Sequence, residues 1–229
     1  MAAVIVIVIT TTTTAAPEAE AVVSYPGFGP PPTPHYSGYL DASAGCDTDK
    51  NGPECQLHYM LAMAEDVDST RDEAAPTIVW FNGGPAWYVT FFFSFLYLFK
   101  YLSKRRSILF MPNVPSSGFV CLFLFFVVIS SSLVEGFFLE SGPFTMAAKG
   151  GILENPYSWT KAGVNFLALE SPVGVGFSYC SKQIENNEPC YADDQSTAKM
   201  NKAALMDFFD NKFPELDGGD LYISGTCCD

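Results

Sequence analysis

The stretch Trp80-Phe81-Asn82-Gly83-Gly84-Pro85 decides the fold. It follows the β-branched apolar run 77–79, which predicts a buried strand. Two glycines and a proline then end the strand, and the glycines leave backbone N–H groups bare at its exit, where the chain can bend and approach a ligand closely. The segment therefore predicts an anion-binding loop after a core strand. The alternative is an ordinary turn.

Composition sets the class of protein. The chain has 229 residues, enough for one sizeable domain, and 48% of them are hydrophobic, so a substantial core can form. The formal net charge is −13, from 12 Lys and Arg against 25 Asp and Glu. This charge excludes a nucleic-acid partner, which requires a basic footprint. It suits an acidic compartment, where partial protonation of carboxyl groups relieves the repulsion between them.

Cysteine spacing indicates an oxidising compartment. Of the seven cysteines, Cys46 and Cys55, and likewise Cys180 and Cys190, lie close enough in sequence to close two loops as disulfides. The odd count leaves at least one thiol without a partner inside the chain.

Metal binding is not expected. The sequence has no Cys-x-x-Cys pair, and its only histidines are His35 and His58, so it predicts no zinc site. No other metal and no cofactor are expected either.

The N-terminal segment is typical of a secretory signal peptide. A short apolar run covers residues 2–9, and Ala19-Glu20-Ala21 offers a cleavage site between small residues. We therefore expect a signal peptide over residues 1–21, followed by one domain over 22–229. The alternative is a disordered leader.

The first half of that domain predicts antiparallel strands. Residues 25–34 are rich in Pro and Gly and predict an irregular surface segment. Residues 35–40 predict an edge strand, residues 41–54 a turn, and residues 57–64 a returning strand. Antiparallel strands that lead into the buried strand at Thr77 are typical of a mixed sheet.

The second half predicts a βαβ unit. Residues 165–169 form a buried strand that leads into a Gly-rich loop, and residues 221–224 form another apolar strand. Between them, Asp193 and Asp194 can cap a helix that begins near 195 and ends at Pro214. We expect the apolar face of this helix to comprise Ala198, Leu205, Phe208 and Phe209. A strand, a helix and a further strand in this order indicate a parallel sheet.

An apolar segment interrupts this pattern at 87–135. Two runs, 89–102 and 119–133, are near or below the length of about 20 residues that spans a bilayer, and basic residues lie between them. One alternative is therefore membrane association through a hairpin over 89–133. The other is that the insert is translated non-coding sequence.

Several motifs together resemble the serine carboxypeptidases, a family of secreted or vacuolar α/β-hydrolases. They occur in the family's order, between residues 22 and 225: Tyr25–Phe28, Trp80–Pro85, Gly142–Phe144, Asn155–Trp159, Glu170–Tyr179, Asp193-Asp194, Phe213–Glu215 and Tyr222–Gly225. The resemblance implies an α/β-hydrolase fold, here truncated, with a mixed sheet and helices on both faces. It implies hydrolysis of the C-terminal peptide bond of peptides at acid pH, or the acyl transfer of a related branch.

The resemblance also implies roles for individual residues. Asn82 and the Gly83 N–H would grip the terminal carboxylate of the substrate, and Gly84 would be one oxyanion-hole donor. Glu140 would be one of two glutamates that share a proton and bind the same carboxylate. A carboxyl group can bind a carboxylate only when it is protonated, and two carboxyl groups held close together in a low dielectric favour that state.

The family pattern breaks near residue 226. The resemblance puts Thr226 where the family has its second glutamate and Cys227 where it has the serine nucleophile, and His35 and His58 do not match the catalytic histidine. A thiolate at Cys227 would need a base to activate it. We therefore expect this chain to be inactive as a peptidase, with a home in the secretory pathway, secreted or in a vacuole or lysosome. A second class is a non-catalytic protein that binds peptide carboxylates.

Overall fold

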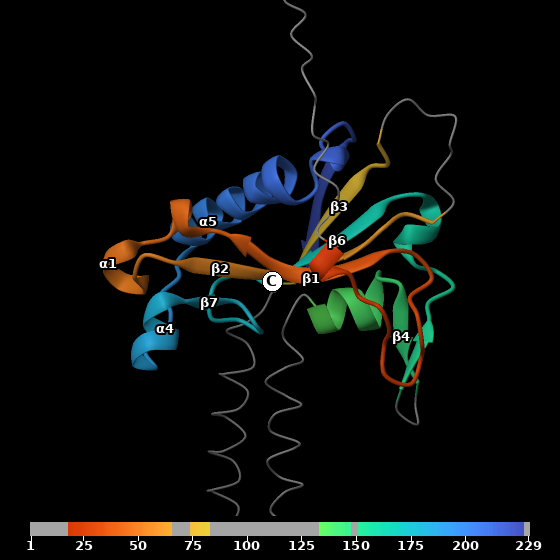
Figure 1. Cartoon of the computed structure of the whole chain (residues 1–229), viewed down its shortest axis with the longest axis horizontal. Coiled ribbons are helices and arrows are strands. Elements are labelled where there is room, and N and C mark those ends of the chain that lie inside the picture. The colour runs from red at the N-terminus through yellow and green to blue at the C-terminus, as the bar shows by residue number, and fades with distance from the viewer. Residues whose placement is uncertain (1–17, 66–73, 83–132, 148–150, 227–229) are drawn as a thin grey trace, which may run out of the picture.

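The computed structural model describes residues 18–65, 74–82, 133–147 and 151–226 (Figure 1). The strands are β1 (His35–Asp41), β2 (Cys55–Ala62), β3 (Thr77–Asn82), β4 (Phe144–Met146), β5 (Ile152–Glu154), β6 (Asn165–Leu169), β7 (Tyr179–Cys180) and β8 (Leu221–Thr226). The α-helices are α1 (Thr48–Asn51), α4 (Ser181–Asn186) and α5 (Asp194–Asp207). The other helical elements are η1 (Glu18–Glu20), η2 (Ser43–Gly45), η3 (Leu133–Glu140), η4 (Trp159–Ala162), η5 (Phe208–Lys212) and η6 (Pro214–Leu216).

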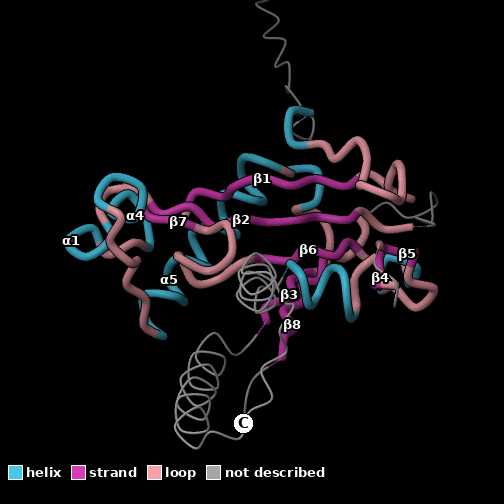
Figure 2. Tube along the Cα trace, turned by 90° about the horizontal axis from the view of Figure 1, so that it is seen from below, coloured by secondary structure: helices cyan, strands magenta, loops and turns pink. Residues whose placement is uncertain are grey.

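A mixed six-stranded sheet organises the described residues. Its order is β1-β2-β6-β3-β8, with β7 paired to β2, and β4 and β5 form a separate hairpin (Figure 2). β1, β6 and β7 each pair antiparallel with β2, whereas β3 runs parallel to both β6 and β8. The predicted combination of antiparallel strands followed by a parallel half is confirmed.

Two hydrophobic cores lie on opposite faces of this sheet, because successive side chains of a strand point to opposite faces. Leu57, Tyr59 and Leu61 of β2 pack on the side that α5 covers. Met60 and Ala62 pack on the other side, with the aromatic residues of η3 and β4. Figure 1 shows α5 and η3 on the two sides of the sheet. The expected mixed sheet with helices on both faces is therefore confirmed.

Helix α5 begins at the predicted cap. The Ser196 N–H donates to Asp193 Oδ1 at 2.7 Å, and the Asp193 N–H donates to Ser196 Oγ at 2.9 Å, which makes a reciprocal capping box. The bonds from the backbone N–H and the hydroxyl of Ser196 lower the pKa of the Asp193 carboxyl group to about 2. The helical stretch that continues α5 ends at Lys212, with Phe213 as its cap residue before Pro214, as expected.

The predicted apolar face of α5 was partly wrong. Met200, Ala204 and Phe208 are the residues buried against the sheet, and they follow one another at intervals of four. Ala198 is exposed, and with Leu205 it lies on a second apolar stripe, about a quarter turn away. The prediction of Phe208 is confirmed, and Leu205 and Phe209 pack against the same core although they are only partly buried.

The Pro- and Gly-rich segment 25–34 also differs in part from its prediction. Most of it lies at the surface, but Tyr25 is only 8% exposed and belongs to the core beneath β1. The aromatic ring contacts of Tyr25 with His35 and Phe144 explain its burial.

Both predicted disulfides are present. Cys46 is bonded to Cys55, and Cys180 is bonded to Cys190. Cys55 and Cys180 are also direct partners in the pairing of β2 with β7. The two covalent loops therefore meet at one place in the sheet.

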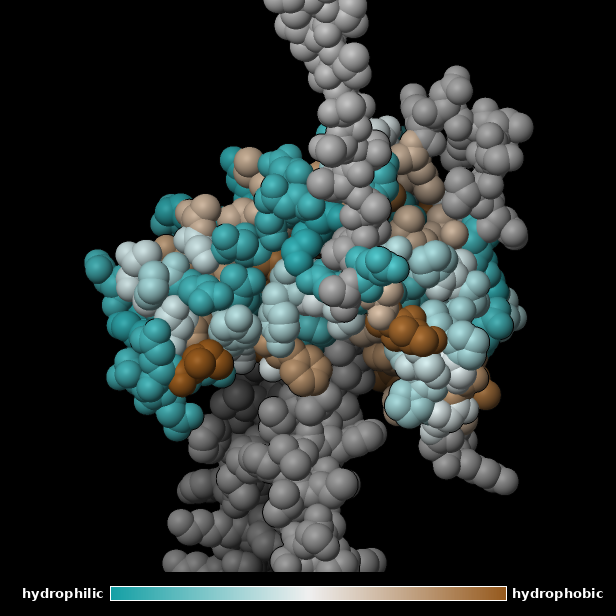
Figure 3. All heavy atoms as spheres, in the orientation of Figure 1, coloured by the Kyte–Doolittle hydropathy of each residue, from teal (hydrophilic) through white to brown (hydrophobic). Residues whose placement is uncertain are grey.

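The surface in Figure 3 is mostly hydrophilic around α1 and α4, and hydrophobic residues appear there as separate spots. Among the described residues, no helix has both the length and the apolar character to cross a membrane. The segment 89–132, which carries most of the predicted membrane hairpin, and residues 1–17 of the predicted signal peptide 1–21 lie outside these residues.

Candidate functional site

The ends of β3 and β8 define one edge of the sheet. The two parallel strands pair from Thr77 with Leu221 up to Asn82 with Thr226, so their carboxyl ends lie side by side. A side chain at Gly225 would collide with the carbonyl oxygen of Phe81, so the two strands require glycine there. In α/β sheets, ligands bind just beyond the carboxyl ends of parallel strands. The loop that follows Asn82 therefore starts at the edge where a ligand site is expected.

Glu140 comes from a different element. It is the last residue of η3, and its side chain is exposed. The Asn155 side-chain amide donates to the carbonyl oxygens of Glu140 at 3.1 Å and of Gly142 at 2.9 Å, which fixes the backbone where η3 ends. A side chain at Gly136, one turn earlier, would collide with the indole of Trp80 in β3. η3 therefore packs directly against the strand that leads to Asn82.

The structure describes only some of the other predicted site residues. Asn82 is described as the backbone end of β3, whereas Gly83, Gly84 and Cys227 lie outside the described residues. The roles of these residues in gripping a carboxylate and an oxyanion stay predictions.

His35 lies in an aromatic cluster under β1. Its side chain is 1% exposed, and its ring packs edge-on against the rings of Tyr25, Phe137 and Phe144. Tyr25 Oη lies 3.0 Å from His35 Nδ1. Burial lowers the pKa of His35 to about 4, because the apolar surroundings disfavour the charged ring. The same burial raises the pKa of Tyr25. Both groups are neutral at physiological pH.

His58 has polar partners on both ring nitrogens. His58 Nδ1 lies 3.1 Å from Glu170 Oε2, and His58 Nε2 lies 3.0 Å from Ser37 Oγ. The Phe177 N–H also donates to Glu170 Oε2, at 2.8 Å. Sequence reasoning missed this arrangement, because the three side chains lie 21 and 112 residues apart in the chain.

The Gly-rich loop after β6 is held from within. The Ser178 hydroxyl donates to the Glu170 carbonyl oxygen at 2.6 Å and accepts the His58 N–H at 2.8 Å. Gly176 has a positive φ of +57°, and a Cβ atom there would collide with the Glu170 carboxyl group. This position therefore requires glycine. The buried hydroxyl of Ser178 therefore holds the loop against β2.

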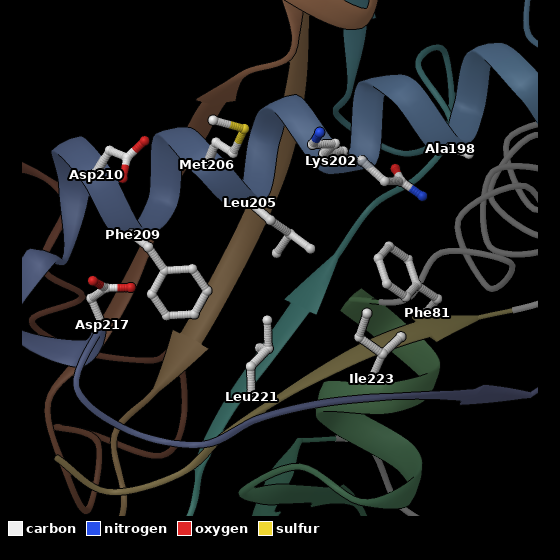
Figure 4. Close-up of a pocket in the computed structure, with 11 residues that line it drawn as sticks. Phe81, Ala198, Lys202, Leu205, Met206, Phe209, Asp210, Asp217, Leu221 and Ile223 are labelled. Atoms are coloured by element: carbon white, nitrogen blue, oxygen red, sulfur yellow. The ribbon is translucent and has the colours of Figure 1, made fainter. Parts of the chain in front are cut away.

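A groove of about 540 Å³ lies between α5 and the edge strand β8. Phe81 of β3, Leu205 of α5, Phe209 of η5, and Leu221 and Ile223 of β8 converge on it (Figure 4). Its lining is mostly apolar, and the polar residues lie among the apolar ones. The lining residues are Phe81, Ala198, Asn201, Lys202, Leu205, Met206, Phe209, Asp210, Asp217, Leu221 and Ile223.

These features define the class of protein. A mixed sheet with a parallel half and helices on both faces is the architecture of the α/β-hydrolases. A sequence model described as "Serine carboxypeptidase" matches residues 130–227. The chain belongs to the serine carboxypeptidase family.

Individual proteins agree with this assignment. Serine carboxypeptidase ctsa-3.1 of Caenorhabditis elegans is 32% identical over 193 residues, which cover 83% of this chain and 23% of that protein. The lysosomal protective protein of Mus musculus is 28% identical over 213 residues, covering 92% of this chain and 31% of that protein.

A solved structure supports the fold. The structure of Kex1(Δ)p, a prohormone-processing carboxypeptidase from Saccharomyces cerevisiae, superimposes with a TM-score of 0.52 and 19% sequence identity. The superposition covers 84% of this chain and 31% of that one. The chain thus spans less than a third of the length of these relatives.

Proposed function

We propose that this chain provides the part of a serine carboxypeptidase that recognises the free C-terminus of a peptide. Asn82 and the Gly83 N–H bind the terminal carboxylate, Glu140 adds a protonated carboxyl group, and the Gly84 N–H donates to the oxyanion. The observation that supports the proposal is the parallel register of Asn82 with Thr226, because Asn82 ends β3 and ligands of α/β sheets bind beyond the carboxyl ends of parallel strands.

Packing of η3 supports the role of Glu140. Because η3 contacts β3 through Gly136 and Trp80, and Asn155 fixes its far end, the element that carries Glu140 is anchored to the strand that carries Asn82. A carboxyl group binds a carboxylate only while it holds a proton, so binding is expected to strengthen towards acid pH.

The test is equilibrium binding of one peptide in two forms, with a free and with an amidated C-terminus, measured by calorimetry at acid and neutral pH. We expect the free form to bind at least about tenfold more tightly at acid pH, which corresponds to one charge-assisted hydrogen bond or more. The Asn82→Ala variant should reduce this preference, and Glu140→Gln, whose amide donates at every pH, should weaken its dependence on pH. Glu185→Gln, which changes an exposed glutamate of α4, is the matched control. Equal affinity for the two peptides would refute the proposal.

We further propose that the 229-residue polypeptide binds peptides without cleaving them. Neither histidine belongs to the proposed carboxylate site, since His35 bonds to Tyr25 and His58 to Ser37 and Glu170, and Cys227 takes the family's nucleophile position. We expect no release of the C-terminal residue from a blocked dipeptide at acid pH. Turnover that Cys227→Ala abolishes would contradict this expectation.

We propose a location in the secretory pathway, with a lysosome or vacuole as the destination. Two disulfides are typical of proteins from oxidising compartments, and one relative is a lysosomal protective protein. Confocal imaging of the full chain carrying a C-terminal tag tests this. A purely cytosolic signal would exclude it.

A further inference from the structure

Ser37, His58 and Glu170 form one continuous chain of hydrogen bonds across three neighbouring segments of the sheet. Ser37 lies on β1, His58 on β2, and Glu170 directly after β6, so a separate backbone segment holds each side chain. The distances are 3.0 Å from Ser37 Oγ to His58 Nε2 and 3.1 Å from His58 Nδ1 to Glu170 Oε2. The Glu170 N–H also donates to the His58 carbonyl oxygen at 2.9 Å, which ties the two backbones together.

The hydrogen-bond geometry fits a tautomer of His58 that joins an acid to an alcohol. Glu170 Oε2 accepts the Phe177 N–H at 2.8 Å, and in this tautomer it also accepts the His58 Nδ1–H. His58 Nε2 then holds a lone pair that accepts the Ser37 hydroxyl proton. A serine, a histidine in this tautomer and a buried acid are the groups that activate a serine nucleophile.

Burial strengthens this arrangement. Glu170 is completely buried and His58 is 7% exposed. Glu170 Oε1 is buried as well and has no hydrogen-bond partner among the described residues. A buried carboxylate with an unbonded oxygen is stabilised by a positive charge beside it. Glu170 would therefore stabilise the His58 ring when the ring takes a proton.

The serine end of the chain lies where the sheet is partly exposed. Ser37 is half-buried, whereas Tyr39 and Phe177, whose rings flank His58 at 5.4 and 5.2 Å, are 38% and 59% exposed. These rings give an apolar rim beside a polar, activated hydroxyl group. Such a rim suits the aryl or alkyl part of a small ester.

We propose that Ser37 is an activated nucleophile that accepts acyl or phosphonyl groups from small electrophiles such as aryl esters. Ser37 Oγ forms the new bond to the acyl carbon, and its proton moves to His58 Nε2. The bond from the acyl carbon to the leaving oxygen then breaks, and that oxygen takes the proton from His58. Ser37 is left acylated until water releases the acid. The site shares no residue with the proposed carboxylate site.

An alkyl fluorophosphonate tests the proposal on the full chain. Its phosphorus binds Ser37 Oγ, and fluoride leaves. Tandem mass spectrometry should find the group on Ser37, and Ser37→Ala should remove it. Ser24→Ala, which changes an exposed serine before β1, should leave the rate unchanged. A label found only on another residue, or no label, would overturn the proposal.

The role of His58 has its own measurement. His58→Gln keeps a side chain that can hydrogen-bond but removes the base, so the labelling rate should fall about 100-fold. Should this variant fail to fold, as judged by circular dichroism, the unmodified chain is compared in buffer and in denaturing urea. Unfolding separates Ser37 from His58, so the same fall is expected. An unchanged rate in either comparison would overturn the proposal.

Glu170 acts through His58 and is a positioning residue. Its contact predicts a strongly downfield proton resonance from His58 Nδ1–H, which Glu170→Gln should remove. The same variant should slow labelling about tenfold, a smaller loss than removal of the base itself. A resonance and a rate that both survive in a folded Glu170→Gln variant would show that the chain of hydrogen bonds is structural only.

Discussion

His35 and His58 lie on the same face of the same sheet, yet their surroundings make opposite use of an imidazole ring. His35 sits in an aromatic cluster, with one hydroxyl partner and a buried Nε2 that has no partner among the described residues. His58 joins an acid to an alcohol. The apolar cluster keeps the ring of His35 neutral. In the proposed mechanism, Ser37 and Glu170 instead let the ring of His58 take and return a proton. The sheet face alone therefore does not decide what a histidine does, because the side chains that surround the ring decide it.

The largest change in the free energy of unfolding is expected when an aromatic ring that packs on His35 is removed. Phe144→Ala deletes a fully buried ring that contacts Tyr25, Phe28 and His35, so the free energy of unfolding should fall by about 3–5 kcal/mol. Phe177→Ala, near His58, removes a ring that is 59% exposed and should cost less than about 1 kcal/mol. Urea unfolding at pH 7 measures both. Equal losses would remove the distinction between the two surroundings.

The pH dependence of stability comes next in size. The pKa of His35 is about 4 in the folded chain and 6.5 in its ordinary state, so the unfolded chain binds the proton more tightly. The contribution of His35 is fully present above pH 6.5 and is lost as the pH falls towards 4, by about 3 kcal/mol in total.

The His35→Phe variant isolates this contribution. Carboxylates titrate in the same range, so the quantity to measure is the difference in unfolding free energy between the unmodified chain and the variant at each pH. This difference should change by about 3 kcal/mol between pH 7 and pH 4 in favour of the variant. A constant difference would contradict the buried, neutral state of His35.

A smaller effect is expected at the hydroxyl group that partners His35. Tyr25→Phe leaves His35 Nδ1 buried without its partner, which should cost about 1–2 kcal/mol in unfolding free energy. The double variant Tyr25→Phe/His35→Phe removes both polar groups, so it should recover most of the loss at pH 7. A double variant less stable than either single variant would argue against this account.

The smallest effect on stability is expected at the serine of the polar chain. Ser37→Ala removes a half-buried hydroxyl group and should lower the unfolding free energy by less than about 1 kcal/mol. Thermal unfolding followed by circular dichroism measures it. A loss of several kcal/mol would mean that Ser37 is mainly a structural residue.

Local patterns predicted most of the secondary structure. The runs at 77–79 and 165–169, the cap at Asp193 and the stop at Pro214 were sufficient to place β3, β6 and α5, because each signal is contained in a few neighbouring residues. The disulfides followed from sequence spacing alone.

Other features depend on tertiary contacts that no local pattern carries. Tyr25 is buried by Phe144 and His35, and the phase of α5 is set by which stripe meets the sheet. At the candidate site, the sequence indicated the edge at Asn82, and the register with Thr226 agrees with it. The chain from Ser37 through His58 to Glu170 could not be predicted, because it joins segments that only the folded sheet brings together.

Because Cys55 and Cys180 are paired across β2 and β7, the two disulfides lie side by side, and reduction of one is expected to affect the other. A reductant that opens one of them exposes a thiol beside the other, where thiol–disulfide exchange can occur without diffusion. Preparations handled with and without dithiothreitol are therefore expected to differ in how firmly the outer end of the sheet is held, and redox history becomes a variable to control in every experiment on this polypeptide.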